Sequence, residues 1–370
     1  MKTIKLLSLT FLFLCHQNFL PQKKALIFGI SGQDGIYLTQ LLIEKGYEVH
    51  GVVRESGSQK TRQLKRFFDD EKHDTQPILH FGDVTDLINI LELINSIAPD
   101  EIYNLAAQSN VKISFDTAFS TAQINALGAL NILEAIKSLK HNIRYFQASS
   151  SEMFGKSNEF LQNEMTSFAP RSPYAIAKLY AHWITINYRE AYGVFACNGI
   201  LFNHESPLRP ESFVSKKIAK AAVQIAAGVQ DILYLGNLDV KRDWGYAKDY
   251  VQAMWLTLQE ELPDDYVIAT GKNHSVREFV ELAFKIVGIE IEWNGVGIEE
   301  KGINKKTGKT VIAIDSAYFR PTEVQSSCGD ASYIKKKLGW QPTTSFNNLI
   351  TLMVEHEIRD LETTNQERKI

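Results

Sequence analysis

The sequence has little cysteine, no marked excess of one charge and no internal repeat. Its three cysteines, Cys15, Cys197 and Cys328, lie far apart and without His-rich neighbourhoods, which excludes a disulfide framework and a zinc pattern. With 40 basic and 43 acidic residues, the formal net charge is −3, so the basic excess that selects for phosphate backbones is missing. We therefore expect no nucleic-acid partner, no metal centre and a reducing, cytoplasmic location.

The N-terminal extension, residues 1–22, resembles a targeting signal in part. A basic start, Met1–Lys5, precedes the apolar run Leu6–Cys15, as in a signal peptide, and this run is too short to span a bilayer. No small-x-small cleavage pattern follows it. Export through this segment and a dispensable extension from an upstream start both remain open. We expect no membrane partner and leave residues 1–22 out of the fold prediction.

The remaining chain has the composition of a globular protein, with 44% apolar and 22% charged residues. From Lys23 to about Ile200, short β-branched runs alternate with stretches whose apolar residues recur at helical steps. This pattern predicts a Rossmann-type α/β fold, a doubly wound parallel sheet covered by helices. The expected strands are Ala25–Phe28, Glu48–Val53, Ile78–Phe81, Glu101–Asn104, Arg144–Ala148 and Phe195–Ile200, and the expected helices are Ile36–Lys45, Ile88–Ile97 and Asn125–Lys137.

The alternation fades after Ile200, which predicts a smaller, mixed α/β lobe for the substrate. We place a cofactor-binding domain at residues 23–203 and the mainly substrate-binding lobe at 204–370. A helix is expected at Phe213–Ala227, and a strand-like run at Tyr266–Ala269 suggests that the first sheet is completed by about residues 240–270. The Lys-rich stretch Lys301–Lys309 is interpreted as a solvated loop.

A glycine-rich turn joins the first expected strand to the first expected helix. It reads Gly29-Ile30-Ser31-Gly32-Gln33-Asp34-Gly35. Glycines at this spacing allow a tight turn and a close approach of the backbone to a pyrophosphate, whose charge the amides at the helix start receive. The turn predicts a dinucleotide site, with Gly29, Ser31, Gly32, Gln33, Asp34 and Gly35 as cofactor-binding candidates.

The ends of the next strands supply further cofactor candidates. Arg54 ends the second strand, where Arg favours the 2′-phosphate of NADP, and its neighbour Glu55 opposes that choice. The pair Asp83 and Val84 follows the third strand, and Leu105, Ala106 and Ala107 follow the fourth, where small residues let a ligand approach. Asp83 could instead cap a helix beginning near Thr85.

Tyr174 and Lys178 are four residues apart and share one face of an expected helix. In this arrangement the ammonium can lower the pKa of the phenol and hold the nicotinamide ribose. The pair lies about 140 residues after the glycine turn and follows Ser149-Ser150-Ser151 at a strand end. With these features the chain is identified as a member of the short-chain dehydrogenase superfamily.

Glu152 distinguishes between reactions within this superfamily. Moving a hydride and a proton needs only a hydroxyl, Tyr and Lys, whereas an elimination needs one more base. Once C4 of a sugar is a ketone, the C5 proton is acidic, and a carboxylate can remove it while hydroxide leaves C6. Glu152 therefore favours a dehydratase over an epimerase or a 4-keto reductase.

From about Lys24 to the region of Met353, the chain resembles the GDP-mannose 4,6-dehydratase family. The resemblance is carried by Gly32–Gly35, Gln147–Glu152, Pro170–Tyr174, Tyr180–Tyr188, Asn198–Pro207, Arg242–Trp244 and Tyr318–Pro321. It implies that GDP-mannose is converted to GDP-4-dehydro-6-deoxy-mannose and water, with a hydride moved from C4 to C6 through bound NADP, as in GDP-fucose and GDP-deoxyhexose synthesis. It also implies a homodimer or homotetramer.

The resemblance assigns roles to single residues. Ser150 takes the place of the family's active-site Thr, Glu152 that of its base, and Tyr174 with Lys178 those of its redox pair. His204 and Arg209 fall on cofactor- or substrate-contacting positions, and Arg242 and Arg320 on residues that hold the diphosphate. We further expect Ser109 to bind cofactor and substrate, and Asn203, Lys217 and Glu323 to bind substrate.

Three positions depart from the family pattern, namely Ser150 for Thr, Glu55 for a second Arg, and Pro210 for a frequent Gly. The first keeps the hydroxyl, the second bears on NADP preference and tetramer assembly, and the third removes freedom to adopt positive φ near the sugar nucleotide. Two other functions remain open, another extended nucleotide-sugar epimerase or reductase and a catalytically idle NADP-binding protein.

Overall fold

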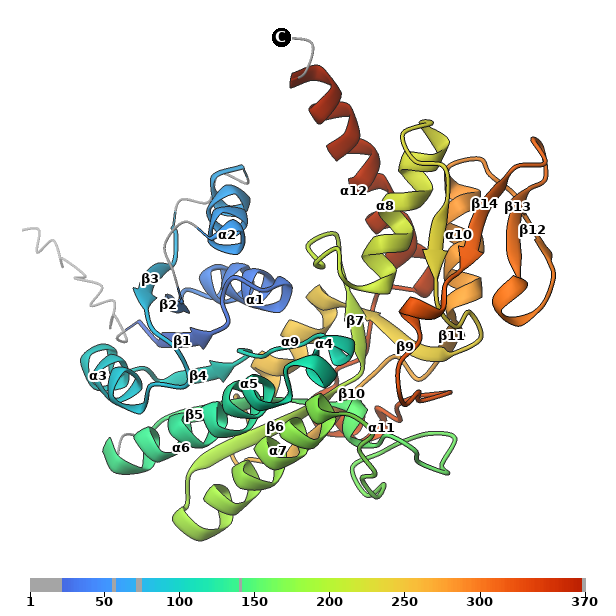
Figure 1. Ribbon diagram of the computed structural model, residues 1–370. Coiled ribbons are helices and arrows are strands. Elements are labelled where there is room, and N and C mark those ends of the chain that lie inside the picture. Colours follow the sequence, from blue (N-terminus) through green and yellow to red (C-terminus); the bar gives the residue numbers. More distant parts are fainter. Residues whose placement is uncertain (1–21, 55–57, 71–74, 140–141, 368–370) are drawn as a thin grey trace, which may run out of the picture.

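A seven-stranded sheet lies at the centre of the molecule (Figure 1) in the computed structural model, which describes residues 22–54, 58–70, 75–139 and 142–367. Every pairing in this sheet is parallel. In spatial order the strands are β10 (Asp265–Ile268), β6 (Phe195–Leu201), β5 (Arg144–Ser150), β4 (Glu101–Asn104), β1 (Lys24–Phe28), β2 (Glu48–Val53) and β3 (Ile78–Phe81). The order reverses between β1 and β4, where open α/β sheets bind their ligands.

Helices cover both faces of this sheet, which confirms the predicted doubly wound fold (Figure 1). One face packs against α1 (Gln33–Glu44), α2 (Gln59–Asp70), α9 (Ala247–Thr257) and α11 (Ser332–Leu338). The other face packs against α3 (Leu87–Ile97), α6 (Gly128–Leu139) and α7 (Pro173–Tyr192). The strands are apolar on both faces because both faces are covered.

Between β4 and α6 the chain forms α4 (Val111–Asp116), α5 (Ala118–Ala122) and a π-helical turn, η1 (Gln123–Leu127). The wider turn carries Asn125, whose side chain accepts from Gln108 N at 2.8 Å and donates to Gln108 O at 3.0 Å. Both contacts fix the loop that follows β4. The sequence predicts an ordinary helix here, because a π turn keeps nearly the same apolar period as an α-helix.

The C-terminal lobe contains two small sheets and three helices (Figure 1). The first sheet pairs β11 (Asn273–Ser275), β9 (Lys241–Tyr246) and β7 (Asn203–Glu205), and the second pairs β12 (Ile291–Asn294), β13 (Lys301–Asn304), β14 (Thr310–Ile314) and β8 (Leu233–Leu235). The helices are α8 (Val214–Ala226), α10 (Val276–Ile286) and α12 (Phe346–Glu367), and short 3-10 turns lie at η3 (Gly297–Glu299) and η4 (Ser316–Tyr318). A further 3-10 turn, η2 (Ser151–Met153), follows β5 of the large sheet. The lobe has an apolar core of its own, built on α8, α10 and α12.

The expected strands are all present within two residues at either end. The Lys301–Lys309 interpretation is wrong in its first half, because Lys301–Asn304 forms β13 and only Lys305–Lys309 is a turn. Gly302 is the buried residue of that strand, and the surrounding lysines conceal it in the sequence. The predicted division at residue 203 stays a prediction, although β10, α9 and α11 do return to the first sheet. Of the N-terminal extension, all but Gln22 lies outside the described residues.

Candidate active site

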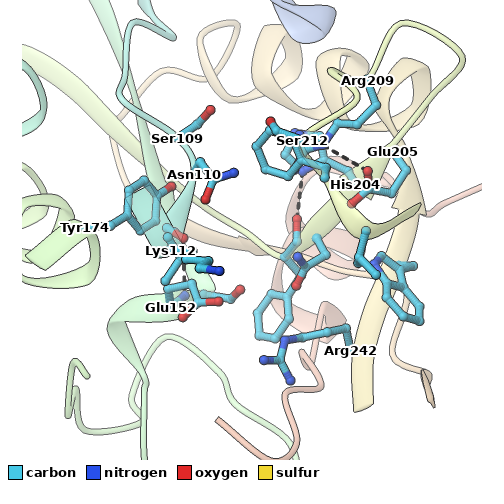
Figure 2. Close-up of a pocket in the computed structure, with 18 of the residues that line it drawn as sticks. Ser109, Asn110, Lys112, Glu152, Tyr174, His204, Glu205, Arg209, Ser212 and Arg242 are labelled. Carbon is cyan, nitrogen blue, oxygen red and sulfur yellow. Dashed lines mark hydrogen bonds and ion pairs between the residues drawn. The ribbon is translucent and has the colours of Figure 1, made fainter. Parts of the chain in front are cut away.

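A cavity of about 610 Å³ lies at the carboxyl ends of the parallel strands, between the sheet and the C-terminal lobe. Figure 2 shows Tyr174 and Glu152 on one side of it, with His204, Glu205 and Arg209 across from them and Arg242 at one end. Most predicted site residues line this cavity: Asp34, Leu105, Ala107, Ser109, Ser150, Glu152, Tyr174, Lys178, Asn203, His204, Arg209, Lys217, Arg242, Arg320 and Glu323. The structure thus brings together residues that are up to 289 positions apart, since the set begins at 34 and ends at 323.

The glycine turn has the geometry that a dinucleotide requires. Gly29 has a φ of 87°, and a Cβ there would lie 2.8 Å from Ala106 N. A Cβ on Gly35 would lie 2.4 Å from Ile30 O, so glycine lets α1 pack on its own turn. Gly32, in contrast, has an ordinary φ of −82°, and a Cβ there would meet only Gly29 O, at 3.4 Å. Gly32 therefore leaves space beside the N-terminus of α1, where a pyrophosphate fits.

The other cofactor candidates at the strand ends are spread around this turn. Val84 is buried, and Arg54 is exposed at the end of β2. Asp83 Oδ1 accepts from Thr85 N at 2.9 Å and from Thr85 Oγ1 at 2.7 Å. Asp83 therefore closes a turn and does not cap the helix, because the N-cap of α3 is Asp86. Glu55 lies outside the described residues.

Tyr174 and Lys178 lie on the first turns of α7. The helix begins where Ser172 accepts from Ala175 N at 3.1 Å, with Pro173 at the first helical position. Both side chains are buried and both line the cavity. Lys178 Nζ donates to Ala148 O at 2.7 Å, so the helix is tied to β5 beside Ser150.

Burial dominates the titration of this pair. It raises the pKa of Tyr174 to about 12, although a hydrogen bond from the Ser150 hydroxyl opposes the rise. It also lowers the pKa of Lys178 to about 8. The expected lowering of the phenol pKa by the ammonium is therefore wrong for the protein alone, because the ammonium points to Ala148 O and desolvation outweighs the neighbouring charges.

Ser150 and Glu152 lie at the end of β5, where the chain turns into η2. Ser150 Oγ accepts from Glu152 N at 3.2 Å, which fixes the two residues relative to each other. The Glu152 carboxylate is mostly buried, and its Oε1 lies 3.4 Å from Nη1 of Arg320. Hydroxyl, carboxylate, phenol and ammonium thus meet on one wall of the cavity.

His204 joins the substrate lobe to the glycine turn. Its Nδ1 donates to Phe202 O at 2.7 Å, because a carbonyl can only accept, and its Nε2 lies 2.8 Å from Asp34 Oδ2. Gln33 Nε2 donates to His204 O at 2.8 Å. Burial alone would raise the pKa of Asp34, but His204 holds it below its ordinary value, and the carboxylate raises the pKa of His204. Each partner thus favours the charged form of the other.

Two arginines that line the cavity are paired with carboxylates. Arg209 Nε lies 3.0 Å from Glu205 Oε2, and its guanidinium is 3.6 Å from the centre of the Phe213 ring. Arg242 is buried, with Nη2 3.0 Å from Glu323 Oε1 and Nη1 donating to Val324 O at 2.7 Å. These arginines keep their charge inside the cavity because each has a carboxylate partner.

Lys112 and Tyr318 are site residues that the sequence argument missed. The Nζ of Lys217 lies 3.3 Å from the centre of the Tyr318 ring, and that of Lys112 lies 5.5 Å from the same ring. Lys112 also donates to Ala317 O, so α4 of the first domain meets η4 of the lobe. Tyr318 begins one of the segments that resemble the family. Lys112 lies in no such segment, and only the folded structure shows that it lines the cavity.

The described part of the chain contains neither a metal-binding cluster nor a membrane-spanning helix. No group of three or more His, Cys, Asp or Glu residues there could hold a metal ion. Within the same residues, no helix is both long and apolar enough to cross a membrane.

Comparison with known proteins identifies the family. The family model described as GDP-mannose 4,6 dehydratase matches residues 26–353. The chain belongs to the GDP-mannose 4,6-dehydratase family. It is 53% identical over 349 residues to the GDP-mannose 4,6-dehydratase of Sinorhizobium fredii, covering 93% of this chain and 99% of that protein. It is 50% identical over 347 residues to the GDP-mannose 4,6 dehydratase of Homo sapiens, covering 93% of both chains.

Solved structures confirm the fold of this family member. The UDP-glucose 4-epimerase of Thermus thermophilus in complex with NAD aligns with a TM-score of 0.73 and 22% identity, covering 90% of this chain and 98% of that one. RMD from Pseudomonas aeruginosa complexed with NADPH aligns with a TM-score of 0.72 and 23% identity, covering 92% and 98%. Both neighbours were solved with a nicotinamide dinucleotide.

Proposed function

We propose that the protein is a hydro-lyase that converts GDP-mannose to GDP-4-dehydro-6-deoxy-mannose and water. The observation that carries this proposal is the meeting of Ser150, Glu152, Tyr174 and Lys178 on one wall of a cavity that Arg242 and Arg320 also line, with Arg320 next to Glu152. An epimerase or reductase needs the hydroxyl, phenol and ammonium only. The additional carboxylate is what an elimination requires.

The residues of this chain divide the reaction between them. Tyr174 takes the proton of the sugar 4-hydroxyl, and the Ser150 hydroxyl donates to the oxygen that becomes the ketone. Glu152 then removes the acidified C5 proton. Of the two protons taken from the 4-hydroxyl and from C5, one leaves with the C6 hydroxyl as water and the other returns to C5 once the hydride is at C6. Lys178 orients the ribose beside Tyr174 and holds positive charge next to it.

A nicotinamide cofactor supplies the acceptor and donor of the hydride that moves between C4 and C6. The space beside Gly32 and the N-terminus of α1 fits its pyrophosphate, and Tyr174 with Lys178 fits its ribose. Because Arg54 ends β2 with an exposed guanidinium, we propose NADP over NAD. Arg54→Ala should weaken binding of NADP and leave that of NAD unchanged in a fluorescence titration; equal weakening of both would remove Arg54 from the choice.

The nucleotide end of the substrate fits the lobe side of the cavity. Arg242 and Arg320 supply two guanidinium groups for a diphosphate, and Lys217 lies on the ring of Tyr318 nearby. Apolar side chains, among them Val240, Trp244 and Val276, line the same region and suit a flat base. This arrangement supports GDP-mannose as the substrate.

The decisive experiment incubates the full chain and NADP with GDP-mannose and follows the product by mass spectrometry. We expect the loss of one water without net reduction of cofactor. Glu152→Gln should retain substrate binding and lose the dehydration. If only another nucleotide sugar lost water, the enzyme would be a dehydratase with a different substrate. We would then attribute the changed specificity to the loop at Pro210. No reaction with any nucleotide sugar would leave an idle dinucleotide-binding protein.

We further propose a homo-oligomer in the cytoplasm. Helix α7 presents an exposed apolar patch of Ile176, Tyr180 and Trp183, of which Trp183 is 55% exposed. A second copy of the chain is the occupant that we propose for this patch. Trp183→Lys should lower the mass measured by light scattering after gel filtration, and an unchanged mass would exclude this face. The buried free thiols of Cys197 and Cys328 suit a reducing compartment.

A further inference from the structure

Both arginines that face the proposed diphosphate position already have carboxylate partners. Arg242 Nη2 lies 3.0 Å from Glu323 Oε1. Arg320 Nη1 lies 3.4 Å from Glu152 Oε1 and 3.8 Å from Glu323 Oε1. All four side chains line the same cavity, so two positive and two negative charges balance there before any ligand arrives.

The two arginines differ in how firmly they are held. Arg242 is on strand β9, is 5% exposed and donates to two backbone carbonyls, those of Lys241 and Val324. Arg320 follows η4 in a segment without helix or strand, and its side chain is 29% exposed. Its contacts with the two carboxylates, at 3.4 and 3.8 Å, are looser than the 3.0 Å pair of Arg242. Arg320 is therefore the guanidinium that can change partner.

The partner of Arg320 is the carboxylate that has to accept a proton. A carboxylate oxygen that is held by a guanidinium is occupied, so it is less free to approach the C5–H bond. A diphosphate presents several oxygens and two negative charges, and it can engage a guanidinium through two hydrogen bonds at once. When the diphosphate takes Arg320, Glu152 loses its counter-ion at the moment when the sugar is in place.

We propose that Arg320 exchanges Glu152 for the diphosphate of the substrate, so that substrate binding itself frees the carboxylate that acts at C5. This inference rests on the proposed function and adds a mode of regulation to it. The pair of Arg320 and Glu152 is then an autoinhibitory contact of the resting enzyme. Glu152 and the diphosphate compete for one guanidinium.

Competition for Arg320 predicts that a variant without the Glu152 carboxylate binds GDP more tightly. If Glu152 were a simple binding contact, the same variant would bind GDP more weakly. Removal of the Glu152 charge should tighten a diphosphate ligand, because Arg320 then keeps only its 3.8 Å contact with Glu323 in the resting enzyme. The probe is GDP, titrated calorimetrically into the full chain saturated with NADP. We expect Glu152→Gln to tighten GDP about threefold to fivefold, the range that a partly exposed ion pair carries. We expect Arg320→Gln to weaken GDP about tenfold.

A double variant, Glu152→Gln with Arg320→Gln, distinguishes the exchange from the general effect of removing a negative charge. Loss of any negative charge near an anionic ligand favours binding, with or without Arg320. The exchange predicts that the gain from Glu152→Gln disappears when Arg320 is also changed to Gln. Glu211→Gln is the matched control, because Glu211 lines the cavity and pairs with Lys220 rather than with either arginine. Its effect on GDP should be the same in both backgrounds.

Two results would overturn the exchange alone: GDP that binds the wild type but is not tightened by Glu152→Gln, and a gain that persists in the Arg320→Gln background. A wild type that does not bind GDP would overturn the proposed substrate and the exchange together. Tightening that requires Arg320 would support both.

Discussion

The two walls of the cavity are built in different ways. The cofactor wall is backbone and buried side chains: Gly29 and Gly35 fit where no Cβ can, and desolvation shifts the pKa values of Tyr174 and Lys178. The substrate wall is made of ion pairs from distant segments, such as Arg242 with Glu323 and Arg320 with Glu152. The first wall is fixed by packing, whereas the second can be rearranged by a charged ligand.

The difference between the walls matches the different ligands that they bind. A dinucleotide is bound in the same way in every cycle, so a rigid turn at a strand end suits it. The nucleotide sugar must enter and leave, and charges that pair with one another in its absence avoid an uncompensated buried charge. Substitutions in the first wall should therefore change chemistry, stability or cofactor binding. Those in the second should change the affinity for the nucleotide of the substrate, and Glu152 is needed for the chemistry as well.

The largest effect is expected for Tyr174→Phe, which removes the group that takes the 4-hydroxyl proton. Turnover should fall by about 10³-fold, within the range of general acid–base catalysis, while NADP and GDP binding stay within about threefold. Tyr192→Phe is the control, because Tyr192 is the last residue of the same helix, with 54% of its surface exposed. Steady-state kinetics of both variants decide the matter; equal activity of the two would exclude Tyr174 as the acid–base group.

Two glycine substitutions in the turn should have different effects, one on stability and the other on NADP binding. Gly29→Ala places a Cβ 2.8 Å from Ala106 N at a φ of 87°, so we expect a loss of about 2 kcal/mol or more in the free energy of unfolding. Gly32→Ala meets no such contact and should change stability by less than about 1 kcal/mol. Its methyl fills the space proposed for the pyrophosphate, so NADP affinity should fall about tenfold. Denaturant unfolding and fluorescence titration measure the two properties separately, and a stable Gly29→Ala variant would contradict the steric argument.

Much of the cofactor wall was predictable from sequence, and much of the substrate wall was not. The strands have apolar, β-branched runs of fixed period, and the glycine turn follows one of them directly, so local signals suffice. Arg242, Arg320 and Glu323 could be proposed only through the resemblance to a family. Their pairing with carboxylates depends on tertiary contacts between residues up to 168 positions apart, and no local pattern encodes such contacts.

Three misses have physical reasons. The Lys-rich stretch 301–309 hides a strand at 301–304, because pairing with β12 and β14 outweighs the low strand propensity of these residues. Lys112 enters the cavity through the packing of α4 near η4. The pKa of Tyr174 was expected to fall and is raised instead, because a sequence shows which charges are near but not how deeply a group is buried.

Lys178→Met should stabilise the protein and abolish turnover. Burial lowers the pKa of Lys178 from 10.5 to about 8, so the ammonium destabilises the fold by about 3 kcal/mol at neutral pH, and the contact to Ala148 O returns about 1 kcal/mol. The unfolded chain binds more protons between these two pKa values, so wild-type stability should rise with pH from about 8 to 10.5.

The variant, unfolded without cofactor, should therefore be more stable than the wild type by about 2 kcal/mol at pH 7, and the difference should shrink as pH rises through that window. Chemical denaturation at pH 7, 8 and 9 would show it. A constant difference across this range would mean that the lysine is not a buried cation in the folded protein.

The smallest effect is expected for Lys217→Gln on the substrate wall. Lys217 lies over the Tyr318 ring at 3.3 Å and donates to Tyr234 O at 2.7 Å, so its charge is only partly desolvated. GDP affinity should fall about threefold, and less so at high salt, because a charge contact of this kind is screened. Stability should stay within about 0.5 kcal/mol of the wild type. The matched control is Lys220→Gln, one turn later on α8, because Lys220 pairs with Glu211 and does not itself line the cavity. Lys217→Gln could instead lower the free energy of unfolding as much as the free energy of GDP binding. The substrate wall would then stabilise the fold as the cofactor wall does, and the two walls would not differ in this respect.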